Sequence, residues 1–277
     1  MTVIAIKRHH HNPPMALVEA IAEAAGEASL SKSAIKRALV FGGGWLKVAG
    51  SKQLKRCRKA KQLVRPGDYF EFYYDPQLLA EALPPPRPVM ETPSWGIWYK
   101  PVNQLSQGSR FGEANSRDVC VKQQRQAPVH LIHRLDREAS GLLMLAYTPA
   151  AAAALSQLWA GREIAKYYQV QVLGQLEPEV GDIQLPLDDK PAHTQYRQVS
   201  STGGTSRVDV RLYTGRLHQI RRHFAAIGHP VLGDPRYGEG NHYDNGLQLV
   251  AVGLDFTDPC NNRQRIECRL PAELCLY

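Results

Sequence analysis

Neither disulfide bonding nor membrane insertion is supported by this sequence of 277 residues. Its five cysteines are an odd number and form no CxxC pair, which argues against a disulfide framework and favours a reducing cytoplasm. No window approaches about twenty consecutive apolar residues, and the amino end, MTVIAIKRHHHNPP, lacks the pattern of a signal peptide. We therefore expect a cytoplasmic protein that does not associate with a membrane.

Acidic residues are also in the minority, with 26 Asp and Glu against 34 Lys and Arg and a formal net charge of +8. This excess suits a protein that approaches a polyanion, so nucleic acid is the first partner to consider. Many proteins are mildly basic without such a role, and the distribution of the cations has to decide. The histidine run at residues 9–11 has no partner ligands nearby, so we expect a solvated run and no metal site.

A proline-rich stretch divides the chain. Residues 83–88 read Leu-Pro-Pro-Pro-Arg-Pro, which can neither continue a helix nor join the centre of a sheet, and which favours an extended spacer. The sequence therefore predicts a first domain over residues 1–80, a linker over 81–94 and a second domain over 95–277.

The first domain has the pattern of two helices followed by strands. Apolar spacing predicts helices over residues 15–28 and 33–40, and strands over 45–48 and 69–74. Between these strands lies a stretch with no acidic residue that contains seven cations, Lys52, Lys55, Arg56, Arg58, Lys59, Lys61 and Arg65. Such a stretch is either a solvated loop or a surface whose charges a phosphate backbone neutralises, and we favour the second interpretation.

This order of elements resembles the S4 RNA-binding domain over roughly residues 15–75. The resemblance implies a small α/β RNA-binding module at the amino end. We expect its RNA contacts to come from Lys52, Lys55, Arg56, Arg58 and Lys59.

The second domain alternates between strand and helix patterns. The continuous apolar run from Gly141 to Ala146 predicts a strand that is buried on both faces. Thr148 and Pro149 predict an N-cap and first turn of a helix that extends to Trp159. Further strands are expected over 129–133, 166–172 and 206–213, and a further helix over 215–228.

Three residues of this domain are candidates for chemistry. Asp136 lies between two predicted strands, where a carboxylate needs a partner. On local evidence alone, a structural residue that caps a turn or pairs with a neighbouring arginine is the better explanation. On the helix over 215–228, Leu217, Ile220, Phe224 and Ile227 share one apolar face. Arg221 lies at the edge of that face, either reaching a cleft or extending its stem to solvent, whereas Arg222 points to the opposite side.

Tyr168 is the third candidate. Strand alternation places Tyr168, Val170 and Val172 on one face and Tyr167 on the other. An aromatic ring on such a face either stacks on a nucleobase or belongs to the core.

Together these segments resemble the RluA-type pseudouridine synthases. The resemblance covers about residues 95–258 and is carried by HRLDREASGLLMLA, KYYQV and TGRLHQIRRHFAAIGHPVLGDPRYG in this order. It implies an α+β fold with a mixed, mainly antiparallel sheet flanked by helices. The chain departs from the family pattern at Ala139, at Val250-Ala251 and in the segment Trp98 to Gln104.

The resemblance also implies a reaction and its residues. Asp136 would be the catalytic carboxylate, Arg221 its counter-charge and Tyr168 the platform for the flipped base, with no cofactor. Arg134, His218 and Arg222 are expected to contact RNA.

The expected partner is RNA, with ribosomal RNA favoured over transfer RNA, and the protein is expected to act as a monomer without a protein partner. A non-catalytic RNA-binding or ribosome-assembly protein of the same fold is the main alternative. A hydrolase is a weaker one, because it would require a second, well-placed acid.

Overall fold

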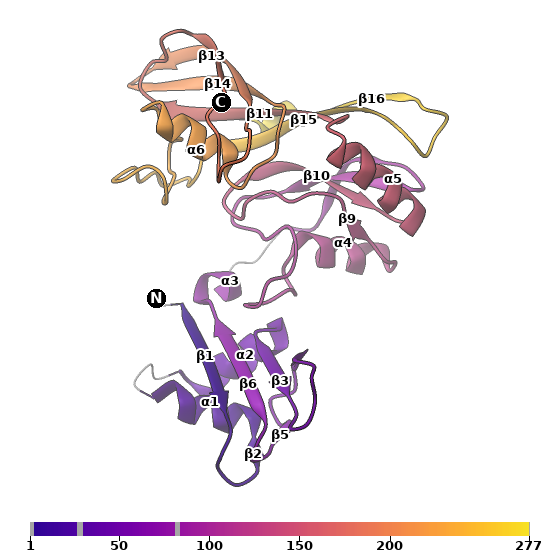
Figure 1. Cartoon of the computed structure of the whole chain (residues 1–277), viewed down its shortest axis with the longest axis vertical. Helices are drawn as coiled ribbons and strands as arrows, with labels where there is room; N and C mark the ends of the chain where they lie inside the picture. Colours follow the sequence, from indigo (N-terminus) through magenta and orange to yellow (C-terminus); the bar gives the residue numbers. More distant parts are fainter. Residues whose placement is uncertain (1–2, 27–29, 81–83, 277) are drawn as a thin grey trace. The chain divides into compact units, whose positions relative to one another are not determined.

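The computed structural model describes residues 3–26, 30–80 and 84–276, and it divides into two compact units (Figure 1). Unit 1 comprises Met1–Pro85 and Gln107–Cys120, and unit 2 comprises Pro86–Ser106 and Val121–Tyr277. The division at Pro85 falls inside the predicted linker, of which residues 81–83 lie outside the described residues.

The linker prediction is wrong for its second half. Strand β7, Arg87–Glu91, pairs with β8, Trp95–Lys100, instead of spanning open space. Pro88 is tolerated within β7 because β7 is the edge strand of its sheet, where a missing N–H need not break a ladder.

Unit 1 is a four-stranded antiparallel sheet covered by helices. The sheet order is β1-β6-β3-β4, and the helices pack their apolar faces on it through Leu17, Ile21, Ile35 and Leu39, all completely buried. The elements are β1 Ile4–His9, β2 Met15–Ala16, α1 Leu17–Ala25, α2 Lys32–Phe41, β3 Gly44–Lys47, β4 Lys55–Arg56, β5 Leu63–Val64, β6 Tyr69–Tyr74 and α3 Pro76–Ala80.

Both predicted helices of unit 1 are present with shifted ends. Helix α1 begins at Leu17 rather than Met15 because Met15 and Ala16 pair with β5, and the predicted end at Ala28 lies outside the described residues. Helix α2 begins after Ser31, whose side chain accepts a hydrogen bond from the Ala34 N–H at 3.2 Å. The predicted strand over 69–74 is found as β6, whereas β1 was not predicted.

The segment from Gln107 to Cys120 joins unit 1 although it follows β8 of unit 2 in the chain. Its Arg110 forms an ion pair at 2.5 Å with Glu71, a carboxylate only 5% exposed that also accepts hydrogen bonds from Tyr69 and Tyr73. The Phe111 ring packs on Tyr73 with 5.1 Å between centroids. Unit 1 is therefore built from two separate stretches of sequence.

Unit 2 contains a ten-stranded sheet with the main order β12-β13-β14-β11-β15-β10-β8-β7. Among the described residues its pairs are antiparallel except for β10 with β15, so the expected mixed, mainly antiparallel sheet is confirmed. Helix α4, Arg117–Arg125, begins in the last residues of unit 1 and continues into unit 2. The remaining elements of unit 2 are β9 His130–Leu131, β10 Ser140–Ala146, α5 Pro149–Ala160, β11 Ala165–Leu173, β12 Val180–Ile183, β13 Thr194–Thr202, β14 Thr205–Leu212, α6 Gln219–Ala226, β15 Leu249–Thr257, β16 Arg265–Arg269 and η2 Ala272–Leu274.

The predicted apolar strand and its following helix are both confirmed. Residues 142–146 of β10 are completely buried, and the Thr148 side chain caps α5 by accepting from the Ala151 N–H at 3.1 Å. One core cluster gathers around Trp95, Leu142 and Leu155, under α5, and a second around Val170, Val208 and Phe224, under α6. Of the helices that the structure describes, none combines the length and apolarity needed to cross a membrane.

The predicted start of the last long helix is wrong. Helix α6 begins at Gln219, since the preceding His218 has a left-handed backbone with φ 52°. Leu217 consequently lies outside the helix and is 63% exposed rather than in the core. Ile220 and Phe224 of the predicted apolar face are buried as expected.

Strand β15 brings the candidate residues together. Its Ala251 is the register partner of Gly141 in β10 and of Tyr168 in β11. The strand that follows the Asp136 loop and the strand that carries Tyr168 therefore flank the same residue of β15.

The close approach of β10 to β15 requires a glycine at position 141. Gly141 has φ +114°, and a Cβ there would lie 2.2 Å from the Ala251 carbonyl oxygen. We predict that Gly141→Ala lowers the free energy of unfolding by about 3 kcal/mol, because a strained backbone and a core overlap each cost about 1–3 kcal/mol. Urea denaturation measures this, with Gly215→Ala as the matched control because no atom lies within 4 Å of its added Cβ. Equal midpoints for both variants would contradict the steric argument.

Candidate active site

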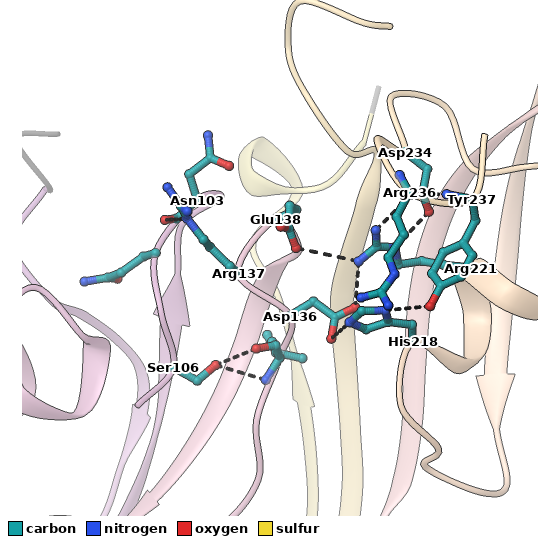
Figure 2. Close-up of polar contacts among 12 residues, drawn as sticks. Asn103, Ser106, Asp136, Arg137, Glu138, His218, Arg221, Asp234, Arg236 and Tyr237 are labelled. Carbon is teal, nitrogen blue, oxygen red and sulfur yellow. Dashed lines mark hydrogen bonds and ion pairs between the residues drawn. The ribbon is translucent and has the colours of Figure 1, made fainter. Parts of the chain in front are cut away.

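Asp136 lies on the loop between β9 and β10, and the backbone on both sides of it is held by the segment around the end of β8. The Ser106 hydroxyl donates to the Leu135 carbonyl at 2.8 Å and accepts from the Leu135 N–H at 3.0 Å (Figure 2). The completely buried Lys100 ammonium donates to the Arg137 carbonyl at 3.1 Å. These contacts fix the peptide groups on either side of the carboxylate, which is 23% exposed.

Arg221 of α6 points at this carboxylate. Its Nη1 lies 3.3 Å from Oδ2 of Asp136 and 3.6 Å from Oε2 of Glu138, although its own side chain is only 2% exposed (Figure 2). Of the two alternatives for Arg221 at the edge of the helix's apolar face, the structure therefore has the guanidinium in the site and not in solvent.

The orientation of Arg221 is set from behind by Asp234. The Arg221 Nε and Nη2 donate to the two oxygens of Asp234 at 2.7 and 2.8 Å, and Asp234 is completely buried. Asp234 also accepts from the backbone N–H groups of Arg236 and Tyr237 at 2.9 and 3.0 Å. A bidentate pair of this kind leaves only Nη1 of the guanidinium directed at Asp136.

The pKa values of this pair follow from burial and from their mutual contacts. Burial alone would raise the pKa of Asp234, but the hydrogen bonds from Arg221 and the two backbone N–H groups lower it below its ordinary value. Burial would likewise lower the pKa of Arg221, but Asp234, and then Asp136 and Glu138, raise it above its ordinary value. The guanidinium is therefore a permanent positive charge in the site.

Tyr168 of β11 faces the same core as Val170 and Val172, as the strand alternation predicted. The register between β11 and β15 shifts between Tyr167 and Tyr168, and such a bulge re-aims the side chain that follows it. Burial and, second, the charge of Asp136 raise the pKa of Tyr168. The phenol is therefore protonated at neutral pH.

His218, immediately before α6, completes the surroundings of Asp136. Its Nε2 lies 3.7 Å from Oδ1 of Asp136, and its Nδ1 lies 3.0 Å from the Tyr237 hydroxyl (Figure 2). The arrangement is thus one carboxylate with a fixed counter-charge on one oxygen and an imidazole beside the other.

Comparison with known sequences identifies the family. Residues 95–226 match the family model described as RNA pseudouridylate synthase. The dual-specificity RNA pseudouridine synthase RluA of Salmonella typhi is 36% identical over 179 residues, which cover 58% of this chain and 81% of that protein. The chain belongs to the RNA pseudouridine synthase family. The reaction of this family is an isomerisation in RNA, the synthesis of pseudouridine.

A further relative and a solved structure are similar to this chain. A Chloroflexus aurantiacus protein named as an RNA pseudouridine synthase is 37% identical over 161 residues, covering 52% of this chain and about half, 51%, of its own length. Human RNA pseudouridylate synthase domain containing 4 has the same fold, with a TM-score of 0.54 at 23% identity over 67% of this chain and 89% of that one.

Arg134 and Arg222, both predicted to contact RNA near the candidate site, differ in whether their side chains are engaged within the protein. Arg134 is exposed. Arg222 points away from the core as predicted, but it forms a bidentate ion pair with Asp188, with both distances 3.0 Å. Its guanidinium is therefore engaged within the protein.

The cations of the basic stretch of unit 1 that are predicted to contact RNA also fall into two groups, arginines that pair within the protein and lysines that are exposed. Arg56 stacks on the Trp45 ring at 4.3 Å, donates to the Ser109 carbonyl at 3.0 Å and is directed at Glu113, so it has a structural role. Arg58 also pairs with Glu113. The remaining cations of the prediction are exposed, namely Lys52, Lys55 and Lys59.

Sequence reasoning assigned no role to Asp234 and did not foresee Glu113. Asp234 lies within the motif that carries the family resemblance, in Gly-Asp-Pro, so a buried acid there was a signal that could have been used. Glu113 gives no local signal, since its partners precede it by more than fifty residues.

Asp234→Asn should disrupt the site from behind. An amide presents one NH₂ to a donor-only guanidinium and leaves Arg221 without its buried counter-charge, which costs about 3–5 kcal/mol of stability. We expect this loss in urea denaturation at neutral pH, together with loss of pseudouridine formation.

The control for this prediction is Asp188→Asn, because the Asp188 pair with Arg222 is exposed and such pairs contribute less than about 1 kcal/mol. The wild type should also lose stability as pH falls through the lowered pKa of Asp234, below its ordinary 3.8. Equal stability of both variants at neutral pH would refute the anchoring role.

Proposed function

We propose that this pseudouridine synthase isomerises specific uridines of structured RNA through the Asp136 carboxylate. The observation that carries the proposal is the 3.3 Å contact between Asp136 and the buried Arg221 guanidinium. It holds a partly exposed carboxylate in one orientation, with a buried positive charge beside one of its oxygens.

The reaction breaks the N1–C1′ bond, rotates the uracil and joins C5 to C1′. The proton lost from C5 is balanced by the one gained at N1, so no redox partner and no water is consumed. Asp136 acts in one of two ways, by adding to C1′ or by taking the 2′ proton to give a glycal, and both are compatible with one fixed carboxylate.

A uridine within folded RNA must leave its stack before Asp136 can reach the ribose, at a cost of a few kcal/mol. We assign the Tyr168 ring as the surface on which the flipped base stacks. Burial and the charge of Asp136 raise the pKa of Tyr168, and we assign its protonated hydroxyl a hydrogen-bonding role towards the bound base.

We assign unit 1 a role in binding the RNA. Its sheet, its covering helices α1 and α2, and its exposed lysines support an S4-like RNA-binding role, and we favour ribosomal RNA over transfer RNA as the substrate. We also propose that the protein acts in the cytoplasm as a monomer. Arg134, exposed and two residues from Asp136, is proposed as a further RNA contact.

Asp136→Asn tests the catalytic assignment. We expect pseudouridine formation to be abolished in chemical mapping of the cognate RNA, with RNA affinity within a few fold of wild type. Glu138→Gln is the matched variant, since Glu138 approaches the same guanidinium nitrogen at 3.6 Å, and it should retain most of the activity. Activity in the Asp136 variant, or its loss only in the Glu138 variant, would reverse the assignment.

A triple Lys→Gln variant at positions 52, 55 and 59 tests the RNA contact of unit 1. Each phosphate contact that is lost should reduce the salt dependence of binding by about 0.7–0.9 in log–log slope, so we expect a decrease of up to about 2–3. Substitution is preferable to deletion of residues 1–80, because deletion would also strip the partners from segment 107–120.

The matched control removes the same charge elsewhere on unit 1, with glutamine at the exposed Lys7, Lys32 and Lys36. Filter binding at several salt concentrations measures the slopes. An unchanged slope in the first variant would show that the basic stretch does not contact RNA.

A further inference from the structure

His218 adopts a backbone conformation that is costly for a residue with a side chain. Its φ of 52° and ψ of 32° lie in the left-handed region, and its side chain makes no capping hydrogen bond to α6. Such strain costs about 1–3 kcal/mol and persists where the surroundings require it. The result of this conformation is that the imidazole lies between Tyr237 and Asp136 (Figure 2).

The two ring nitrogens of His218 have different surroundings. The Tyr237 hydroxyl lies 3.0 Å from Nδ1, within hydrogen-bonding distance, whereas Nε2 faces Oδ1 of Asp136 at 3.7 Å. A lone pair on Nε2 would face the carboxylate's own lone pairs, so the favourable tautomer has the proton on Nε2 and accepts the Tyr237 O–H at Nδ1. Tyr237 therefore selects the tautomer that presents an N–H to Asp136.

We propose that His218 is a positioning residue for Asp136 and that Tyr237 holds it in the required tautomer. The inference rests on the proposed role of Asp136. It replaces the expectation that His218 contacts a phosphate. Arg221 holds Oδ2 of the carboxylate and His218 faces Oδ1, so both oxygens are oriented. The 3.7 Å separation shortens to a hydrogen bond when RNA fills the site, as catalytic contacts commonly do.

The charges that face His218 leave it neutral at neutral pH. Burial lowers its pKa, Asp136 and Glu138 act in the opposite direction, and the guanidinium groups of Arg221 and Arg236 lower it again, so that the pKa stays below the ordinary 6.5. A neutral imidazole donates to Asp136 without neutralising it. Protonation at lower pH would instead form an ion pair that withdraws the carboxylate's charge from the ribose.

Two substitutions separate the ring nitrogens. His218→Gln keeps an NH₂ near the position of Nε2, whereas His218→Asn keeps one only near Nδ1 and tolerates the left-handed backbone. In single-turnover assays on the cognate RNA, we expect the rate constant at saturating enzyme to fall about 100-fold for His218→Asn, because a misplacement of about 1 Å has that effect. His218→Gln should recover most of the wild-type rate constant. The enzyme concentration that gives the half-maximal rate should stay within about threefold of wild type for both variants.

A phosphate contact would give the opposite pattern. The saturating rate constant would be retained, half-saturation would rise, and the log–log salt slope would fall by about 0.7–0.9. That result, or equal rate constants for the Asn and Gln variants, overturns the proposal. The matched control is His242→Asn, at a side chain that is 88% exposed, which should match wild type in every measurement.

Tyr237→Phe keeps the ring and removes only the hydroxyl, so it tests the tautomer independently of any folding defect at position 218. We expect a loss of about threefold to tenfold in the same rate constant, and unchanged activity would overturn the role of Tyr237. The wild-type rate should also decline as pH falls through the lowered pKa of His218, and this decline should be absent in His218→Gln. Failure of the wild type to form pseudouridine would refute the proposed function itself, which distinguishes the two failures.

Discussion

The buried pair between Arg221 and Asp234 is the interaction on which the site depends. A guanidinium that is 2% exposed is stable only where its charge and donors are matched, and Asp234 supplies two acceptor oxygens at 2.7 and 2.8 Å. Because Nε and Nη2 on one edge of the guanidinium both bind Asp234, the remaining Nη1 points towards Asp136 in a single direction. The buried ion pair between Arg221 and Asp234 thus fixes the position of the partly exposed Asp136 carboxylate.

A loop can hold a carboxylate precisely only if its backbone is fixed, and here the sheet and the segment around the end of β8 do so from two sides. Gly141 allows β10 to approach β15 closely, and β15 in turn pairs with the strand of Tyr168 through Ala251. Ser106 and Lys100 then hold the peptides beside Asp136. Precision comes from the rigid elements around the loop rather than from the loop sequence.

What the sequence could predict was local. The apolar run of β10, the Thr148 cap and the facing of Tyr168 follow from periodicity and capping chemistry, and the structure confirms them. The predicted start of α6 was wrong because His218, which precedes the helix, has a left-handed backbone, and a histidine in that conformation gives no sequence signal as a glycine would. Partners distant in sequence, such as Glu113 for the basic stretch, depend on tertiary contacts that periodicity does not encode.

The burial of Ala139 and Val250, where the chain departs from the family pattern, limits how these two residues can affect the choice of substrate. Both side chains are buried, 3% and 4% exposed, and they pack in the two core clusters on the sheet. Buried apolar positions of this kind alter packing and stability, whereas selection among RNAs requires groups that RNA can reach. Under the proposed function, exposed residues such as Arg134 and the lysines of unit 1 are the groups that can select the substrate. On that proposal, the reaction and the selection of the RNA depend on different parts of the chain, because buried residues shape the sheet that carries Asp136 and exposed ones are within reach of RNA.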